Sequence, residues 1–170
     1  MPTYPIRYRL PVAYSTEIGR IIPRWAFLEY RLKETAYMVL GVDYKVGRVA
    51  MREPRTAEYV DMIRDLMSLK SLTTSVDLKE LRKTLEKLQP FRDKLAHGIW
   101  VRHDTTKLPV LQVTKGSYVL ETAGPKTKAK AKIEPLALAV RLADLKTCRR
   151  DIEGATVTIN QWKRDLGAQL

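Results

Sequence analysis

One short segment holds the residue types of phosphate-ester chemistry. Residues 90–98 read Pro-Phe-Arg-Asp-Lys-Leu-Ala-His-Gly, so an arginine stands five positions before a histidine. Asp93 and His97 are four residues apart and share one helix face, so the carboxylate can bind the imidazole, fix its tautomer and favour its charged form. Arg92 lies about 140° around an ideal helix from His97. Its long side chain can still reach a nearby phosphate, and a cation beside a titratable imidazole suits phosphate-ester cleavage.

The same residue types define a complete reaction only when two copies are present. RNA cleavage without a metal ion needs a base for the 2′-hydroxyl, an acid for the leaving 5′-oxygen and a cation for the phosphorane charge. Two copies of His97 across a two-fold axis would supply base and acid, and paired Arg92 side chains would hold the phosphate. The segment thus predicts a homodimer, products with 2′,3′-cyclic phosphate and 5′-hydroxyl ends, and no metal or other cofactor.

The order of these residues resembles a known signature. An arginine, a polar residue, three further residues and a histidine, with Leu-Ala-His-Gly at residues 95–98, resemble the motif of the HEPN ribonuclease-like family. The resemblance implies a helical bundle with the motif near a helix end, and two subunits whose motifs face each other across one cleft. Many members are metal-independent endoribonucleases of toxin-antitoxin, phage-defence or RNA-processing systems, which implies RNA as substrate and an antitoxin or regulatory protein as partner. Asparagine is the commoner second residue, so Asp93 departs from the pattern and places a carboxylate near the RNA.

Apolar periodicity predicts two helices before the segment. Residues 16–40 carry an apolar stripe at helical spacing, and Gly41 is placed to end it. Pro23 either kinks this helix or marks its start. A second helix opens at Pro54 and runs to about residue 70.

A third helix carries the segment itself. It begins at Asp77, which forms a pattern like a capping box with Glu80. Pro90 makes residues 90–97 either a kinked continuation or a new short helix. Gly98 then ends the helix.

A small sheet and a long helix are expected after Gly98. Residues 99–102, 110–114 and 117–122 are rich in β-branched and aromatic side chains, so residues 99–123 predict an antiparallel β-meander. Residues 124–132 form a basic loop. One long helix follows over residues 135–168, with an apolar residue every seventh position and Gly154 as a possible kink. The recurring residues are Leu138, Leu145, Ile152, Ile159 and Leu166.

This seven-residue recurrence has two interpretations. It fits either packing within a bundle or an interface with a second chain. Arg149, Thr156 and Lys163 occupy the positions four residues after members of the stripe, where a coiled coil would need apolar groups. Packing inside a helical bundle is therefore the preferred interpretation.

Length and composition bound the class of protein. The chain has 170 residues, of which 45% are hydrophobic, so one mainly α domain over residues 1–170 is expected, with residues 1–15 as an N-terminal extension. Cys148 is the only cysteine, which excludes an internal disulfide and suits a reducing cytosol. Residues 1–10 lack an apolar signal core and no apolar run is long enough for a bilayer, so the prediction is a cytoplasmic protein with no membrane contact.

Charge points to a polyanionic partner. The chain has 31 Lys and Arg against 19 Asp and Glu, a formal charge of +12, which attracts polyanions such as RNA, DNA or an acidic membrane surface. Trp25 and Trp162 lie on helical stripes and are expected in the core, whereas Trp100 is free to stack on a base. The predicted RNA-binding residues are Lys94, Trp100, Arg102, Lys126, Lys128, Lys130 and Lys132.

Each candidate also has a purely structural alternative. His97 and Lys94 suit the negative end of a helix dipole, and the lysine run in residues 124–132 can be a solvated loop. His103 is a second acid or base only if its turn folds over the cleft. Glu29 and Glu34 either face the cleft or form surface ion pairs. The alternative functions are a non-catalytic module of the same fold that binds a nucleotide, a nucleic acid or a protein, and a structural dimer held by the seven-residue stripe.

Overall fold

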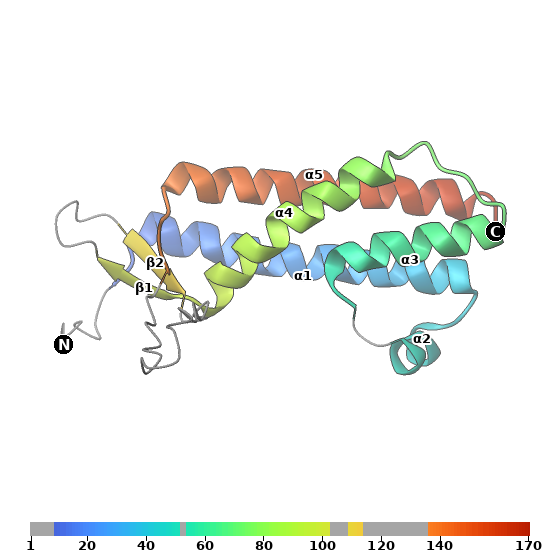
Figure 1. The fold of residues 1–170 in the computed structure, drawn as a ribbon, viewed down its shortest axis with the longest axis horizontal. Helices are drawn as coiled ribbons and strands as arrows, with labels where there is room; N and C mark the ends of the chain where they lie inside the picture. Colours follow the sequence, from blue (N-terminus) through green and yellow to red (C-terminus); the bar gives the residue numbers. More distant parts are fainter. Residues whose placement is uncertain (1–8, 52–53, 103–108, 114–135) are drawn as a thin grey trace, which may run out of the picture.

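Helices dominate the fold, and a small sheet lies at one end of them (Figure 1). The computed structural model describes residues 9–51, 54–102, 109–113 and 136–170. This confirms the mainly α class with a small antiparallel sheet before the final helix. None of the helices in the described residues is long and apolar enough to cross a bilayer. The elements are α1 (Val12–Leu40), α2 (Tyr44–Ala50), α3 (Thr56–Leu69), α4 (Leu78–His97), β1 (Ile99–Arg102), β2 (Pro109–Val113), β3 (Leu136–Ala139) and α5 (Leu142–Gly167).

The longest helices, α1 and α5, lie side by side and run in the same direction (Figure 1). Buried residues in both helices alternate spacings of three and four, which is the pattern of coiled-coil packing. In α5 they are Leu145, Cys148, Ile152, Ala155, Ile159, Trp162 and Leu166. In α1 the matching set is Ile21, Trp25, Leu28, Leu32, Thr35 and Val39.

This pairing corrects one reading of the sequence. The companions of the seven-residue stripe lie three positions after its members, at Cys148, Ala155 and Trp162, and not four positions after. The stripe within α5 is fully buried against the chain's own helices, so packing inside the bundle is confirmed and that stripe is not available to a second chain.

Polar side chains flank the α1–α5 seam. Three pairs join residues that are 129 positions apart, and this constant offset fixes the parallel register of the two helices. Glu17 is buried and accepts a hydrogen bond from Arg149 Nε at 2.9 Å, which lowers the pKa of its carboxyl group. The three pairs are Arg24 with Glu153, Arg31 with Asn160, and Lys163 with Glu34.

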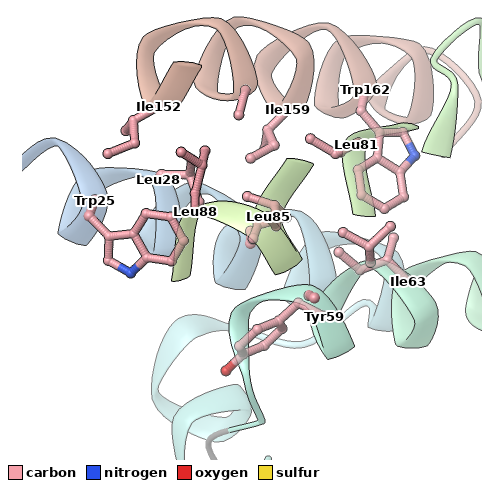
Figure 2. Close-up of a cluster of buried hydrophobic side chains, with 14 of the residues drawn as sticks. Trp25, Leu28, Tyr59, Ile63, Leu81, Leu85, Leu88, Ile152, Ile159 and Trp162 are labelled. Atoms are coloured by element: carbon pink, nitrogen blue, oxygen red, sulfur yellow. The ribbon is translucent and has the colours of Figure 1, made fainter. Parts of the chain in front are cut away.

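Helices α3 and α4 complete the core against this pair. Figure 2 shows Leu81, Leu85 and Leu88 of α4 pointing between α1, α3 and α5. Trp25 and Trp162 are fully buried, as predicted, and Trp162 Nε1 lies 3.2 Å from Met67 Sδ.

Helix boundaries follow local capping chemistry. Gly41 ends α1 with a left-handed φ of 77°, as expected for a glycine at this position. Asp77 Oδ1 accepts a hydrogen bond from Glu80 N at 3.0 Å and starts α4. Both prolines lie inside continuous helices, so α1 extends through Pro23 and α4 continues through Pro90.

Helix α2 was not predicted. It has seven residues and no apolar stripe, and Asp43 caps it by accepting hydrogen bonds from the N–H groups of Lys45 and Val46. Its position depends on Gly47, where a Cβ atom would lie 2.5 Å from the ring of Tyr37. Such a short element is stabilised by this contact with α1 rather than by helix propensity.

The sheet has the strand order β1-β2-β3, and both strand pairs are antiparallel. β2 is central, with Leu111 fully buried. The third strand is Leu136–Ala139, where the sequence predicted the start of a helix over residues 135–168. Its Leu-Ala-Leu-Ala alternation has the two-residue period of a strand, and Leu138 matches the helical stripe only by spacing. The predicted strand 117–122 lies outside the described residues.

Candidate functional site

The predicted catalytic residues lie on the last turns of α4. Leu88 and Leu95 face the core, and Arg92 projects between that face and the solvent with 23% of its side chain exposed. Asp93 is about half exposed, and His97 is exposed at the helix end. The helix therefore presents His97 to solvent and keeps Arg92 partly shielded beside the core.

Asp93 binds Arg92 and not His97. Arg92 Nη1 donates to Asp93 Oδ1 at 3.0 Å, and no hydrogen bond or ion pair joins Asp93 to His97 in the described part of the chain. The predicted Asp93–His97 contact is therefore wrong for this structure. The neighbouring guanidinium offers the carboxylate a charge-assisted bond, which is roughly twice as strong as a bond between neutral groups.

One buried N–H group of Arg92, that of Nε, has no hydrogen-bond partner among the described residues. Unpaired buried donors are rare because each costs about 1–3 kcal/mol of desolvation free energy. The atom is covered by the protein's own atoms, so an acceptor from another molecule could reach it only after the surrounding side chains move.

Gly98 joins this helix end to the sheet. Its backbone is extended, with φ −83° and ψ 154°, so it does not end α4 through the left-handed conformation expected from the sequence. A Cβ atom here would lie 2.5 Å from Leu111 Cδ1 and 2.6 Å from the carbonyl oxygen of Lys94. The glycine is needed because β2 packs directly against the end of α4.

A polar groove of about 630 Å³ runs beside the candidate site, between the start of α3 and α4. Asp93 lines it, whereas Arg92 and His97 do not. Arg82 in this groove is paired with Asp61 at 2.7 Å and with Glu86 at 2.8 Å. The groove thus carries charges of both signs, in contrast to a purely cationic channel.

The predicted RNA-binding residues are only partly placed. Lys94 is half-buried on α4, and Arg102 is exposed on β1. Trp100 is half-buried and meets Tyr14 edge to face, with ring centroids 6.3 Å apart. His103 and the four lysines at 126, 128, 130 and 132 lie outside the described residues.

Two acidic residues that could have faced a cleft are structural. Glu29 Oε1 accepts hydrogen bonds from Trp25 Nε1 and Thr56 Oγ1, both at 2.8 Å. Glu34 is bound by Arg31 and Lys163, and Lys163 lies 3.1 Å away. Both residues join helices. Glu34 forms the ion pairs that the structural alternative predicted, whereas Glu29 is bound by neutral donors.

Two other kinds of site are a cysteine nucleophile and a metal centre. Burial raises the pKa of the Cys148 thiol to about 11, so it stays protonated at neutral pH and is a poor nucleophile. In residues 9–51, 54–102, 109–113 and 136–170, no group of three His, Cys, Asp or Glu side chains is arranged to bind a metal ion.

Sequence reasoning overlooked an exposed aromatic group. Phe27 and Tyr30 on α1 and Tyr44 on α2 are exposed and their rings are neighbours. The available signal was that Phe27 and Tyr30 lie three residues apart on the side of α1 away from its apolar stripe.

Comparisons with models of protein families, with curated proteins and with solved structures found no match for this chain. Function is therefore inferred from the residues at the end of α4 and from their chemistry.

Proposed function

We propose that this chain is a HEPN-like RNA-binding protein that cleaves RNA without a metal ion, at a site formed by Arg92 and His97 of two copies. The observation that carries the proposal is the end of α4, where an exposed imidazole follows an arginine whose buried Nε lacks an acceptor. The net charge of +12 favours a polyanionic substrate. We place this activity in the cytoplasm, in a defence or toxin-antitoxin type system with an antitoxin or regulatory protein as partner.

The chemistry is an internal transesterification. One His97 takes the proton of the 2′-hydroxyl, and the 2′-oxygen then attacks phosphorus. The second His97 gives a proton to the leaving 5′-oxygen, so the products end in a 2′,3′-cyclic phosphate and a 5′-hydroxyl. Arg92 stabilises the negative charge of the phosphorane through the partly exposed end of its guanidinium group.

Two features of α4 support a shared site. Arg92 and His97 point about 140° apart on an ideal helix, so the long Arg92 side chain bends toward the phosphate, and one copy supplies only one of the two imidazoles that the reaction needs. His97 is exposed and therefore open to approach by a second copy. A two-fold arrangement would place one His97 on each side of the scissile phosphate.

The proposal is tested by incubating labelled single-stranded RNA with the purified protein in EDTA. We expect the parent to release fragments with cyclic-phosphate ends, and Arg92→Ala and His97→Ala to release none. Arg82→Ala is the matched control, because Arg82 lies on the same helix and is also paired with carboxylates. Equal cleavage by parent and His97→Ala proteins would overturn the assignment.

A mixing experiment tests whether the site is shared. Parent protein is diluted with an excess of His97→Ala protein and allowed to exchange subunits. If both histidines are needed, activity per parent chain falls as mixed dimers form. Constant activity per parent chain, or a strict monomer in sedimentation, would exclude the two-histidine mechanism.

The second candidate is a non-catalytic RNA-binding module. It is favoured by the 3.0 Å bond from Arg92 to Asp93, which places a carboxylate where RNA phosphate would lie. In that case Asp93→Asn strengthens RNA binding without producing cleavage. A catalytic protein with Asp93→Asn would instead cleave faster, because Arg92 would be free to bind the phosphate.

A further inference from the structure

Six of the eleven large apolar side chains that are exposed in the described residues lie between residues 27 and 49, on the second half of α1 and on α2. Monomeric proteins rarely expose large contiguous apolar patches, and those that do generally use them for binding. Helix α2 stands away from the other helices in Figure 1, and several of these side chains lie on it. These six are Phe27, Tyr30, Leu40, Tyr44, Val46 and Val49, and Val12 is also exposed at the other end of α1.

Three of these side chains form a row of aromatic rings. The rings of Phe27 and Tyr30 are stacked, with centroids 6.4 Å apart and planes inclined by 28°. Tyr30 and Tyr44 follow at 6.2 Å, and Tyr44 meets the buried ring of Tyr37 at 5.7 Å. A row of exposed rings offers successive faces on which bases can stack.

A hollow of about 250 Å³ adjoins this row between α1, α2 and the start of α3. Its volume is below the roughly 300–1,000 Å³ of sites for drug-sized ligands, so it suits a single base or phosphate. Tyr37 and Tyr59 are its buried members, and Lys33 and Arg48 supply cationic groups.

The charge around the hollow favours an anion. Asp43 uses its carboxylate to cap α2. Glu34 accepts a hydrogen bond from the Tyr30 hydroxyl at 3.0 Å, and its charge is offset by Arg31 and Lys163. Arg48 is exposed in the last turn of α2. Aromatic faces beside cations are the combination that binds single-stranded nucleic acid, in which base stacking and phosphate attraction act together.

We propose that this α1–α2 surface binds single-stranded RNA, with bases stacked on Phe27, Tyr30 and Tyr44 and a phosphate held at the hollow by Arg48. The choice of RNA rests on the proposed function. Tyr14, which contacts Trp100 near the candidate site, lies 16 residues before Tyr30 on α1, or about 24 Å along the helix. A strand stacked at 3.4 Å per nucleotide needs at least about seven nucleotides, because Tyr14 and Tyr30 also lie about 160° apart around an ideal helix.

The experiment measures binding of labelled oligouridylate by fluorescence anisotropy, in a His97→Ala background so that the RNA stays intact. The double variant Phe27→Leu/Tyr44→Leu keeps apolar bulk and removes two ring faces, whereas Phe27→Tyr/Tyr44→Phe keeps both rings. We expect the leucine variant to bind about fivefold more weakly or worse, and the aromatic variant to bind like the parent. Leu69→Ala, an exposed site on α3, is the neutral control.

Charge and length give two further readouts. Arg48→Gln is expected to reduce the slope of log affinity against log salt by about 0.7, and Arg48→Lys to preserve it. The loss in the leucine variant is expected to disappear for RNA shorter than about seven nucleotides if such RNA occupies only the α4 end. Circular dichroism of each variant checks that the fold is retained.

The outcomes separate this inference from the proposed nuclease function. Cleavage by the parent with equal RNA binding by leucine and aromatic variants would overturn the RNA surface and leave the nuclease intact. Ring-dependent RNA binding without any cleavage by the parent would support the surface and remove the nuclease. No RNA binding by the parent, with a dimer that the leucine variant dissolves, would assign the surface to self-association and overturn the inference.

Discussion

The α1–α5 seam and the end of α4 differ in how completely their charged side chains are paired within the chain. Along the seam, Glu17 is buried and is bound by both Arg149 and Arg20. At the end of α4, Arg92 has only Asp93 as a described partner, its Nε is unpaired, and His97 is exposed. The first region satisfies its polar groups within one chain, whereas the second has a buried donor without a described partner and an exposed imidazole.

This difference distinguishes polar residues that stabilise the fold from those that the proposed function requires. Charged groups that flank an apolar seam pair with each other and set the register of two helices. At the end of α4, the contact with β2 is made by Gly98 and Leu111. The charged groups there are not required by this packing. The contrast predicts that substitutions in the seam affect stability, and that substitutions at the α4 end affect RNA chemistry.

The largest stability effect is expected from Trp162→Ala in the seam. Trp162 is fully buried, and truncation of such a side chain lowers the free energy of unfolding by about 3–5 kcal/mol. Urea unfolding followed by circular dichroism measures the change. A loss no greater than that of Leu69→Ala, an exposed control, would show that the seam is not the main source of stability.

A smaller loss that depends on pH is expected from Glu17→Gln. The hydrogen bond from Arg149 holds the pKa of Glu17 below its ordinary value, against the opposing effect of burial. A lowered folded-state pKa stabilises the fold above the unfolded-state pKa, and this contribution is lost as pH falls through the folded-state pKa. Thermal melts should therefore separate parent and variant at pH 7 and bring them together in acid below about pH 4.

The control for this prediction is Glu80→Gln. Glu80 forms an exposed pair with Lys83 at 3.7 Å, so its substitution should change the melts little at any pH. A gap between parent and Glu17→Gln that is constant from pH 7 into acid would contradict the role assigned to the Glu17 carboxylate.

Gly98→Ala tests the junction between α4 and the sheet. The new methyl group would meet Leu111 and the Lys94 carbonyl, and overpacking of this kind costs about 1–3 kcal/mol of unfolding free energy. If the sheet positions the α4 end, RNA cleavage should fall as well. Cleavage and urea midpoint are measured on the same preparation, and an unchanged midpoint would mean that β2 does not pack as described.

Gly154→Ala is expected to act in the opposite direction. Nothing lies within 4 Å of a Cβ atom at this position in α5, and alanine in a helix interior is favoured over glycine by about 1 kcal/mol. Urea unfolding should show a gain in stability. A loss would indicate that the glycine has a contact absent from this single chain.

The smallest stability effect is expected from His97→Ala. An exposed residue of this kind changes the free energy of unfolding by no more than about 0.5 kcal/mol. The same substitution should abolish RNA cleavage, which sharpens the contrast with Trp162→Ala. A large loss of stability would place His97 among the structural residues.

Much of the helical fold was readable from local pattern. The apolar stripes of α1, α3 and α4 and the glycine at position 41 predicted these helices to within a few residues. Helix α2 was missed because it is short and contains Gly47, so its stability depends on packing against Tyr37 rather than on local sequence. The strand β3 was missed because Leu138 continued the helical spacing by coincidence.

The candidate site was found in part. The sequence placed Arg92 and His97 at the end of a helix, and α4 does end at His97. The partner of Asp93 could not be predicted, because spacing allowed both His97 and Arg92 as partners and only side-chain placement selects between them.

By itself the sequence determined which helix faces are buried, because periodicity along one helix records the burial of each residue. It also determined that a basic chain carries one arginine and one histidine at a helix end. Only the tertiary structure decided the parallel α1–α5 register, the aromatic row on α1 and α2, and the unpaired Nε of Arg92. Each of these depends on residues far apart in the chain or on a buried environment, and local spacing contains no information about either.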